Sequence, residues 1–218
     1  MLFRSGMDRF VKRDAAATVV EGFQFVDQRG VVLHSPTFPP KAGLAVTATG
    51  SGRIPLQADG GSGPPAVQPA SGGPNAVVNS IAWRITPGPA EVAVRVPIAV
   101  ARPLTVVGAP RLTMTYSGTT PACTRLRRVF AQIVDTDSRV VVGNQITPVP
   151  VRLDGARHRV SLPLETIAYS ATPESHLELQ IVGNSTAYTE PCLGGRIVVR
   201  EATVRLPTVT GLHVVPKG

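Results

Sequence analysis

One serine in the sequence has surroundings that partly fit a catalytic nucleophile. Serine hydrolases of the α/β type carry Gly-x-Ser-x-Gly, because the nucleophile stands on a turn too tight for neighbouring side chains. The closest match here is Gly60-Gly61-Ser62-Gly63-Pro64, which has proline at its last position. The match also lies in a glycine- and proline-rich stretch, where a flexible turn is the simpler interpretation. We therefore expect no catalytic residue in this chain and no hydrolysis by the chain alone.

Metal and cofactor chemistry has equally little support. The sequence has four histidines: His34, His158, His176 and His213. None is paired at a metal-ligand spacing such as H-x-H, so we interpret them as ordinary surface residues. Asp135 and Asp137 could begin a calcium loop, but the glycine and the distal glutamate of that motif are missing. Asp-Thr-Asp-Ser is more typical of a hairpin turn. We expect no metal ion and no cofactor.

The two cysteines, Cys123 and Cys192, both fall in predicted loops rather than inside strands, where unreactive thiols usually lie. If the two loops meet at one end of the fold, the thiols could form a disulfide, which would imply an oxidising compartment. Two unrelated free thiols are the alternative. The pair is therefore a candidate disulfide.

The composition favours strands over helices. The 218 residues are 43% hydrophobic but only 5% aromatic, so a core must rest on valine, leucine, isoleucine and alanine. The chain has 21 glycines and 21 prolines, and both residue types break helices. Valine and threonine recur in short runs between them, as in proteins built of many short strands. The expected fold class is all-β.

The net charge of +8 raises the question of a nucleic-acid partner. The basic residues are scattered, with one tight cluster at Arg125, Arg127 and Arg128, and charge alone supports only non-specific association. Arginine greatly outnumbers lysine, which together with abundant alanine, valine, glycine and proline suggests a GC-rich, bacterial-like genome. No apolar run approaches the ~20 residues of a membrane span. We expect a soluble chain that binds no nucleic acid and does not span a membrane.

The first third of the chain is expected to be irregular. Phe3, Met7, Phe10 and Val11 follow helical spacing, which predicts one short helix over residues 1–14. Residues 15–58 are expected to form connecting hairpins: one over 22–34 around Asp-Gln-Arg-Gly, then a strand pair over 44–49 and 54–57. Residues 59–80 are predicted to be a linker or long surface loop, because more than half of residues 59–75 are glycine or proline.

Regular strands are predicted from about residue 92 onward. Apolar and polar residues alternate over 111–117, 159–164, 176–181 and 201–206, which predicts strands with one face in a core and the other in water. The run from Val129 to Val134 is apolar on both faces, which predicts a central strand. Residues 81–210 are therefore expected to form a two-sheet β-sandwich or jelly roll, with residues 211–218 as a tail.

With the strands placed, residues 108–207 resemble the C-terminal domain of the X-Pro dipeptidyl-peptidase family, which includes cocaine-esterase-like hydrolases. The resemblance rests on GAPRLTMTYSG (108–118), RVFAQIVD (128–135), VGNQITP (142–148) and GGRI (194–197). In addition, MDRFVK (7–12) is similar to the last helix of the catalytic domain in that family, although Arg13 stands where the family pattern has glycine.

The resemblance implies a non-catalytic role for this chain. Such enzymes join an α/β-hydrolase domain, a helical cap and a C-terminal jelly roll, so the resemblance implies a jelly-roll-like β-sandwich of the galactose-binding-like class for this chain. In these enzymes the Ser-Asp-His triad precedes the final helix. It implies that the catalytic residues lie upstream of Met1, that residues 1–14 are a remnant of the hydrolase domain, and that this domain is the missing partner. The parent protein would act on peptide or ester substrates and could be exported; a homo-oligomer is also conceivable.

The alternative is a free-standing carbohydrate-binding jelly roll. Sugar binding generally uses exposed aromatic residues, and the sequence has few candidates: Trp83, Tyr116, Tyr169 and Tyr188. The alternation of residues 111–117 already assigns Tyr116 to a core face.

Overall fold

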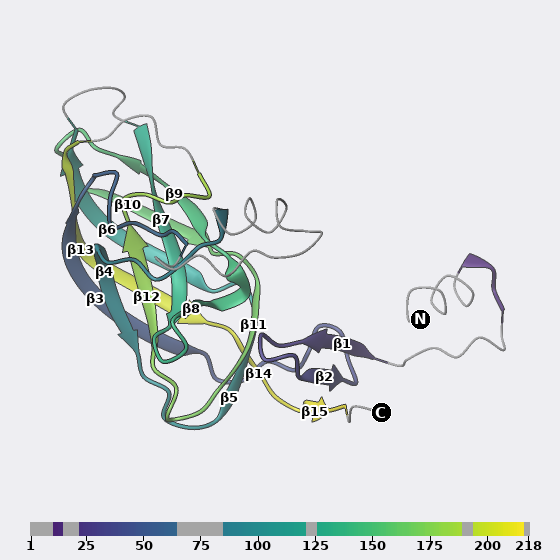
Figure 1. The fold of residues 1–218 in the computed structure, drawn as a ribbon. Coiled ribbons are helices and arrows are strands. Elements are labelled where there is room, and N and C mark those ends of the chain that lie inside the picture. The colour runs from purple at the N-terminus through teal and green to yellow at the C-terminus, as the bar shows by residue number, and fades with distance from the viewer. Residues whose placement is uncertain (1–10, 15–21, 65–84, 121–125, 189–193, 216–218) are drawn as a thin grey trace, which may run out of the picture.

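The computed structural model describes residues 11–14, 22–64, 85–120, 126–188 and 194–215, and nearly all regular secondary structure in these residues is antiparallel strand (Figure 1). The helix predicted for residues 1–14 falls mostly outside the described residues. No described helix is long and apolar enough to cross a membrane. In this part of the chain the strands form several open sheets rather than one closed barrel, as expected of a β-sandwich.

Two sheets face each other and enclose the main core. The first has the order β10 (His158–Pro163), β6 (Arg111–Thr119), β13 (Arg196–Leu206) and β3 (Val46–Pro55). The second contains β4 (Ala93–Ile98), β12 (Leu177–Val182), β7 (Leu126–Asp135) and β8 (Val140–Val141), and β9 (Thr147–Arg152) also pairs with β7. The 3₁₀ turn η2 (Val142–Asn144) follows β8. This pair of sheets confirms the predicted all-β class.

The core between the sheets comes from the alternation that the sequence displays. Leu112 and Met114 of β6 are fully buried, and Val129 and Ile133 of β7 and Leu179 of β12 pack into the same cluster. The alternate residues of β6 and β10 are exposed or half-buried, so these two strands have one core face and one wet face, as predicted. β7 is buried on both faces, which confirms it as a central strand.

Three strands of the first sheet continue into a further sheet. The further sheet contains β5 (Leu104–Gly108), β11 (Ile167–Ala171) and β14 (Thr208–Val209) in the order β11-β5-β14. This is the order β10-β6-β13 of the strands that adjoin them in the chain. Gly108, Pro110 and Pro207 stand where the chain passes from one sheet to the other. Because proline cannot donate to a strand ladder, Pro110 and Pro207 interrupt the pairing at the bend.

A small sheet lies beside the sandwich. β1 (Phe23–Val26) pairs with β2 (Val32–Ser35), and β2 pairs with β15 (His213–Val214). Figure 1 shows these strands on the side away from β3 and β13. The hairpin over 22–34 is therefore confirmed, whereas β15 lies within residues 211–218, which the sequence suggested only as a tail.

Two strand predictions are wrong. The strand pair expected over 44–49 and 54–57 is one strand, β3, which joins the main sheet through β13. Gly50 and Gly52 lie between the two predicted strands, and a Cβ at either position would lie about 3 Å from Val96 or Val94, so the glycines allow β3 and β4 to pack closely. β12 was expected to have a wet face, yet Glu178 and Gln180 are buried.

Candidate functional site

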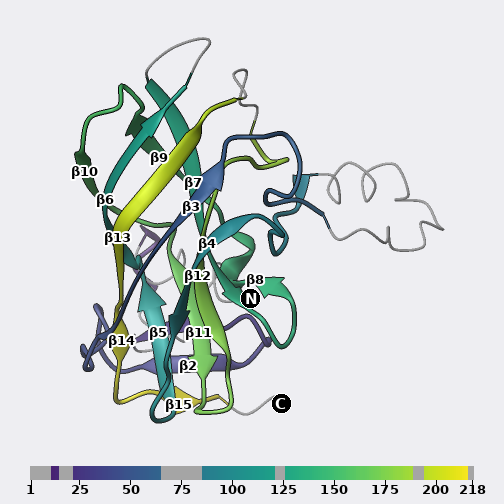
Figure 2. The same cartoon turned by 90° about the vertical axis from the view of Figure 1, so that its left-hand side faces the viewer.

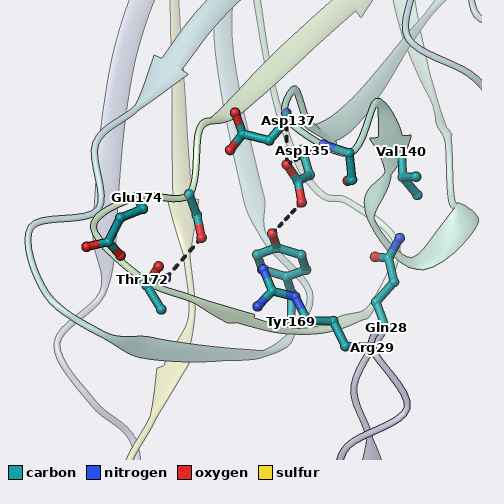
Figure 3. Close-up of a pocket in the computed structure, with 10 residues that line it drawn as sticks. Gln28, Arg29, Asp135, Asp137, Val140, Tyr169, Thr172 and Glu174 are labelled. Atoms are coloured by element: carbon teal, nitrogen blue, oxygen red, sulfur yellow. Dashed lines mark hydrogen bonds between the residues drawn. The ribbon is translucent and has the colours of Figure 1, made fainter.

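A polar hollow of about 480 Å³ lies where the β1–β2 hairpin meets one end of the sandwich (Figure 3). Its volume is that of a small-molecule site. Gln28 and Arg29 come from the hairpin turn, Asp135, Asp137 and Val140 from the β7–β8 hairpin, and Tyr169 from β11. Thr172, Glu174 and Ser175 of the loop before β12 complete the lining together with Ser138.

The hairpin turn that supplies Gln28 and Arg29 is built by Asp27. The Asp27 carboxylate is buried and accepts hydrogen bonds from the backbone N–H groups of Arg29 and Val31, both at 2.9 Å. Gly30 completes the turn with a φ of 76°, in the left-handed region that glycine adopts without strain. The turn therefore holds residues 28 and 29 in one orientation.

Gln28 and Arg29 attach the hairpin to the sandwich. The Gln28 side-chain oxygen accepts a hydrogen bond from Gly143 N–H at 2.8 Å, and its amide nitrogen donates to Val141 O at 3.4 Å. The Arg29 guanidinium lies over the Tyr169 ring, 5.7 Å from its centroid, which is a cation–π distance. The hollow is thus closed on one side by a fixed element.

Tyr169 and Asp135 form the floor of the hollow. The Tyr169 hydroxyl donates to Asp135 Oδ2 at 2.7 Å, and both residues are buried. Burial raises the pKa of Tyr169, and its hydrogen bond to the carboxylate raises it further, against a smaller opposing effect of Arg29. Tyr169 therefore remains a protonated hydrogen-bond donor at neutral pH.

The Asp135 carboxylate is fully committed to donors of its own fold. Burial raises its pKa, but hydrogen bonds from Tyr169, Ser138 and the Asp137 N–H lower it by more, so the net shift is downward. Oδ1 accepts from the N–H groups of Asp137 at 3.1 Å and Ser138 at 3.3 Å. These contacts make a β7–β8 hairpin turn, as predicted, in which the carboxylate accepts from the N–H groups of its own turn.

Thr172, Glu174 and Ser175 complete the polar lining of the hollow. Ser175 Oγ accepts a hydrogen bond from Thr172 N–H at 3.0 Å, and a hydrogen bond to Thr172 lowers the pKa of Glu174, which keeps that exposed carboxylate charged. The hollow therefore presents fixed carboxylates, hydroxyls and one guanidinium. Among the described residues, no three His, Cys, Asp or Glu side chains converge to hold a metal ion.

Ser62 is a buried structural residue, not an exposed nucleophile. Its hydroxyl donates to Gln132 Oε1 at 2.7 Å, and Gln132 Nε2 donates in turn to Gly88 O and Gln180 Oε1, both at 2.9 Å. Ala90 N–H also donates to Gln180 Oε1 at 2.9 Å. This glutamine network holds both ends of the glycine- and proline-rich segment against the outer face of β7 and β12.

Glycine in that segment serves close packing. A Cβ at Gly61 would lie 2.4 Å from Asn184 O, and one at Gly88 would overlap Gly63 O. Residues 60–64 and 86–90 are therefore pressed against the sheet and against each other, although residues 65–84 lie outside the described residues. The flexible turn expected around Ser62 is wrong.

Two of the histidines pair with aspartates, and these pairs were not predicted from the sequence. His158 Nε2 lies 2.7 Å from Asp154 Oδ1, and His176 Nδ1 lies 2.8 Å from Asp137 Oδ1. His34 of β2 and His213 of β15 occupy directly opposite register positions. The i,i+4 spacing of Asp154 and His158 was a signal present in the sequence, whereas the other pairs depend on the fold.

The remaining candidates are only partly described. Cys123, Cys192 and Trp83 lie outside the described residues. Tyr116 is buried, as predicted, and its hydroxyl accepts a hydrogen bond from Arg152 N–H at 2.9 Å. Tyr188 stacks on Phe130 and stays 41% exposed. Of the predicted basic cluster, Arg125 lies outside the described residues, Arg127 is buried and Arg128 is exposed.

Comparisons with known proteins identify the fold. No protein-family model matches the chain, and no curated protein sequence is similar to it. Two crystal structures of a CocE/NonD family hydrolase from Staphylococcus aureus superimpose on 95% of this chain, with TM-scores of 0.57 and 0.54 at 10% and 12% identity. In both, the match covers 45% of the hydrolase chain. This chain thus spans less than half the length of that hydrolase and shares the fold of the matched part.

Proposed function

We propose that this chain is the non-catalytic C-terminal β-sandwich of a serine hydrolase related to X-Pro dipeptidyl-peptidases and cocaine-esterase-like enzymes. It braces the α/β-hydrolase domain and supplies one wall of the substrate cleft. The observation that carries the proposal is the superposition of 95% of this chain on 45% of the Staphylococcus aureus hydrolase. The sequence motifs over residues 108–197 support the same assignment independently.

An apolar surface on the small sheet supports a missing neighbour. Phe23, Phe25 and Phe38 cluster there, with ring centroids 5.9 Å apart for Phe23–Phe25 and 5.0 Å for Phe23–Phe38. Phe38 is 75% exposed and Val214 is 65% exposed. We call the three phenylalanines the aromatic patch. Clustered aromatic side chains in water are unfavourable for an isolated domain and typical of an interaction surface.

The polar hollow is proposed as the cleft wall because it adjoins the hairpin that carries most of the aromatic patch. A hydrolase domain packed on the aromatic patch would bring substrate near Arg29, Asp137 and Glu174. Fixed charges of both signs suit a polar substrate group. In the full-length protein, Glu174→Gln should raise KM with little change in kcat, because it removes substrate binding and no reacting group.

The purified chain tests the first part of the proposal. Alone, it should hydrolyse neither X-Pro anilides nor aryl esters, and turnover abolished by a serine-directed inhibitor would contradict the assignment. It should also bind a hydrophobic dye through the aromatic patch. Phe38→Ser should weaken dye binding, whereas Leu44→Ser should not, because Leu44 is 74% exposed but lies off the small sheet. Equal effects of the two changes would count against a specific docking surface.

A further inference from the structure

Six arginines project from the outer face of the sheet β10-β6-β13-β3, which faces the viewer in Figure 2. All are exposed and lie on four adjacent strands, and we call them the arginine face: Arg53, Arg111, Arg159, Arg196, Arg200 and Arg205. Glu201 is the single acidic residue in these four strands. The fold therefore gathers on one sheet cations that are scattered in the sequence.

Two of these arginines are placed against each other. Arg111 of β6 and Arg205 of β13 are directly opposite in the register, where side chains begin only about 5 Å apart. Like charges in this position destabilise a sheet. Within the described residues the ion pairs involve other groups, and none includes an arginine of this face. The arrangement is unfavourable for the fold alone and favourable for binding an anion.

A row of hydroxyl groups crosses the same face. Ser161, Thr113, Thr203 and Thr49 are consecutive partners across β10, β6, β13 and β3. Thr113 Oγ1 lies 3.0 Å from Ser161 Oγ, and Thr49 Oγ1 lies 3.1 Å from Thr203 Oγ1. Arg111 donates to Ser161 Oγ at 3.2 Å, which joins the row to the charged pair. Hydroxyls and guanidinium groups thus form one continuous polar surface.

We propose that the arginine face binds a linear acidic polysaccharide that carries carboxylate groups. Guanidinium forks pair with carboxylates in a bidentate manner, and serine and threonine hydroxyls both donate to and accept from sugar hydroxyls. An open sheet face contacts an extended ligand rather than enclosing a small one. The ligand would cross the strands along the hydroxyl row, with its carboxylates on Arg111 and Arg205.

Other polyanions fit this face less well. Its outward residues include no aromatic side chain on which a nucleic-acid base could stack. Reading of a duplex groove needs an inserted helix or strand ribbon rather than a sheet face. An extended acidic peptide would pair with a sheet edge through its main chain. The small sheet with the aromatic patch lies on the other side of the molecule in Figure 1, so this inference does not depend on the proposed function.

The test measures binding of polygalacturonate to the full chain at low and moderate salt. Arg111→Gln with Arg205→Gln should weaken binding about tenfold or more, because each lost charge-assisted hydrogen bond is worth more than a neutral one. Arg102→Gln with Arg128→Gln removes the same charge from other exposed positions and should change affinity less than about twofold. The melting temperature of the first double variant should match or exceed that of the wild type, since a repulsive pair is removed.

Two further probes separate carbohydrate recognition from charge. Thr113→Val with Thr203→Val removes two opposed hydroxyls at constant charge and should weaken binding of polygalacturonate but not of polyglutamate. The proposal is overturned if the wild type does not bind polygalacturonate at low salt, or if both arginine double variants lose equal affinity. It is also overturned if polyglutamate or duplex DNA of matched charge binds as tightly as polygalacturonate.

Discussion

The hydroxyl of Tyr169 donates a 2.7 Å hydrogen bond to Oδ2 of Asp135, beneath the Arg29 guanidinium. This contact joins β11 to the end of β7 and fixes the floor of the polar hollow (Figure 3). Because Asp135 is only 7% exposed, its carboxylate must be satisfied by protein donors, and Tyr169 is the one that comes from a different strand. The contact between β11 and the end of β7 therefore depends on a charged, buried hydrogen-bond acceptor.

Removal of this hydrogen bond should destabilise the fold in a pH-dependent way. Tyr169→Phe should cost about 1–3 kcal/mol of unfolding free energy at pH 7, because the bond is made to a charged group. The pKa of Asp135 is lowered in the folded state, so its contribution is present above the unfolded pKa of about 4 and is lost as pH falls through the folded pKa.

Urea unfolding at pH 7 and at pH 3 measures this effect. The wild type should lose stability on the acid side, and Tyr169→Phe should lose less over the same interval, so the difference between the two should shrink at pH 3. A constant difference at both pH values would show that the hydroxyl does not act through the ionised carboxylate.

A substitution at the centre of the glutamine network should destabilise the fold more than a substitution at its end. Gln132→Ala removes one hydrogen-bond partner from each of three groups: Ser62 Oγ, Gly88 O and Gln180 Oε1. It should lower the free energy of unfolding by about 2–4 kcal/mol. Ser62→Ala removes one hydroxyl and should cost about 1 kcal/mol. Thermal unfolding of the two variants gives the order. A larger effect of Ser62→Ala would contradict the described network.

The segment between the two anchored ends should be dispensable for folding. Gly63 and Gly88 are in close backbone contact, so a short chain suffices to join them. Replacement of residues 65–84 by about six Gly and Ser residues, which span up to ~20 Å, should leave the melting temperature within a few degrees of the wild type. Loss of cooperative unfolding in this variant would show that residues 65–84 contribute to the core.

Cys123 and Cys192 are predicted to form a disulfide under oxidising conditions. Cys123 and Cys192 lie in residues 121–125 and 189–193, and the described residues that flank these two segments are in contact. Thr120 Oγ1 donates to Gly194 O at 3.3 Å, and Arg127 donates to the same oxygen at 3.0 Å. Such a cross-link would stabilise the fold by about 4 kcal/mol through the unfolded chain. Mass spectrometry of unreduced peptides decides the question: a linked pair is expected, and two freely alkylated thiols would contradict it.

Local sequence patterns predicted the strands that have one face in the core and the other in water. β6 and β10 alternate between core and water, so their sequences carry a period of two. The β1–β2 hairpin was predictable because Asp27 and Gly30 define its turn locally. In each of these elements the residues that decide the structure lie within a few positions of one another.

Predictions failed where the deciding partner is distant in sequence. Gln180 looked like a surface residue, but its partners Gln132 and Ala90 lie 48 and 90 positions away. The strand pair predicted over 44–49 and 54–57 is one strand, because Gly50 and Gly52 make room for Val96 and Val94 of another sheet. Arg111 and Arg205 looked scattered, and only the β6–β13 register brings them together. Contacts of this kind cannot be inferred from one segment at a time.

The central claim is that this β-sandwich works as part of a serine hydrolase. The most direct measurement is the genomic sequence upstream of the Met1 codon. The account predicts an open reading frame that encodes an α/β-hydrolase domain with a Gly-x-Ser-x-Gly elbow and continues in frame into residue 1. A stop codon in frame just upstream, with no separate hydrolase that binds the aromatic patch, would contradict it.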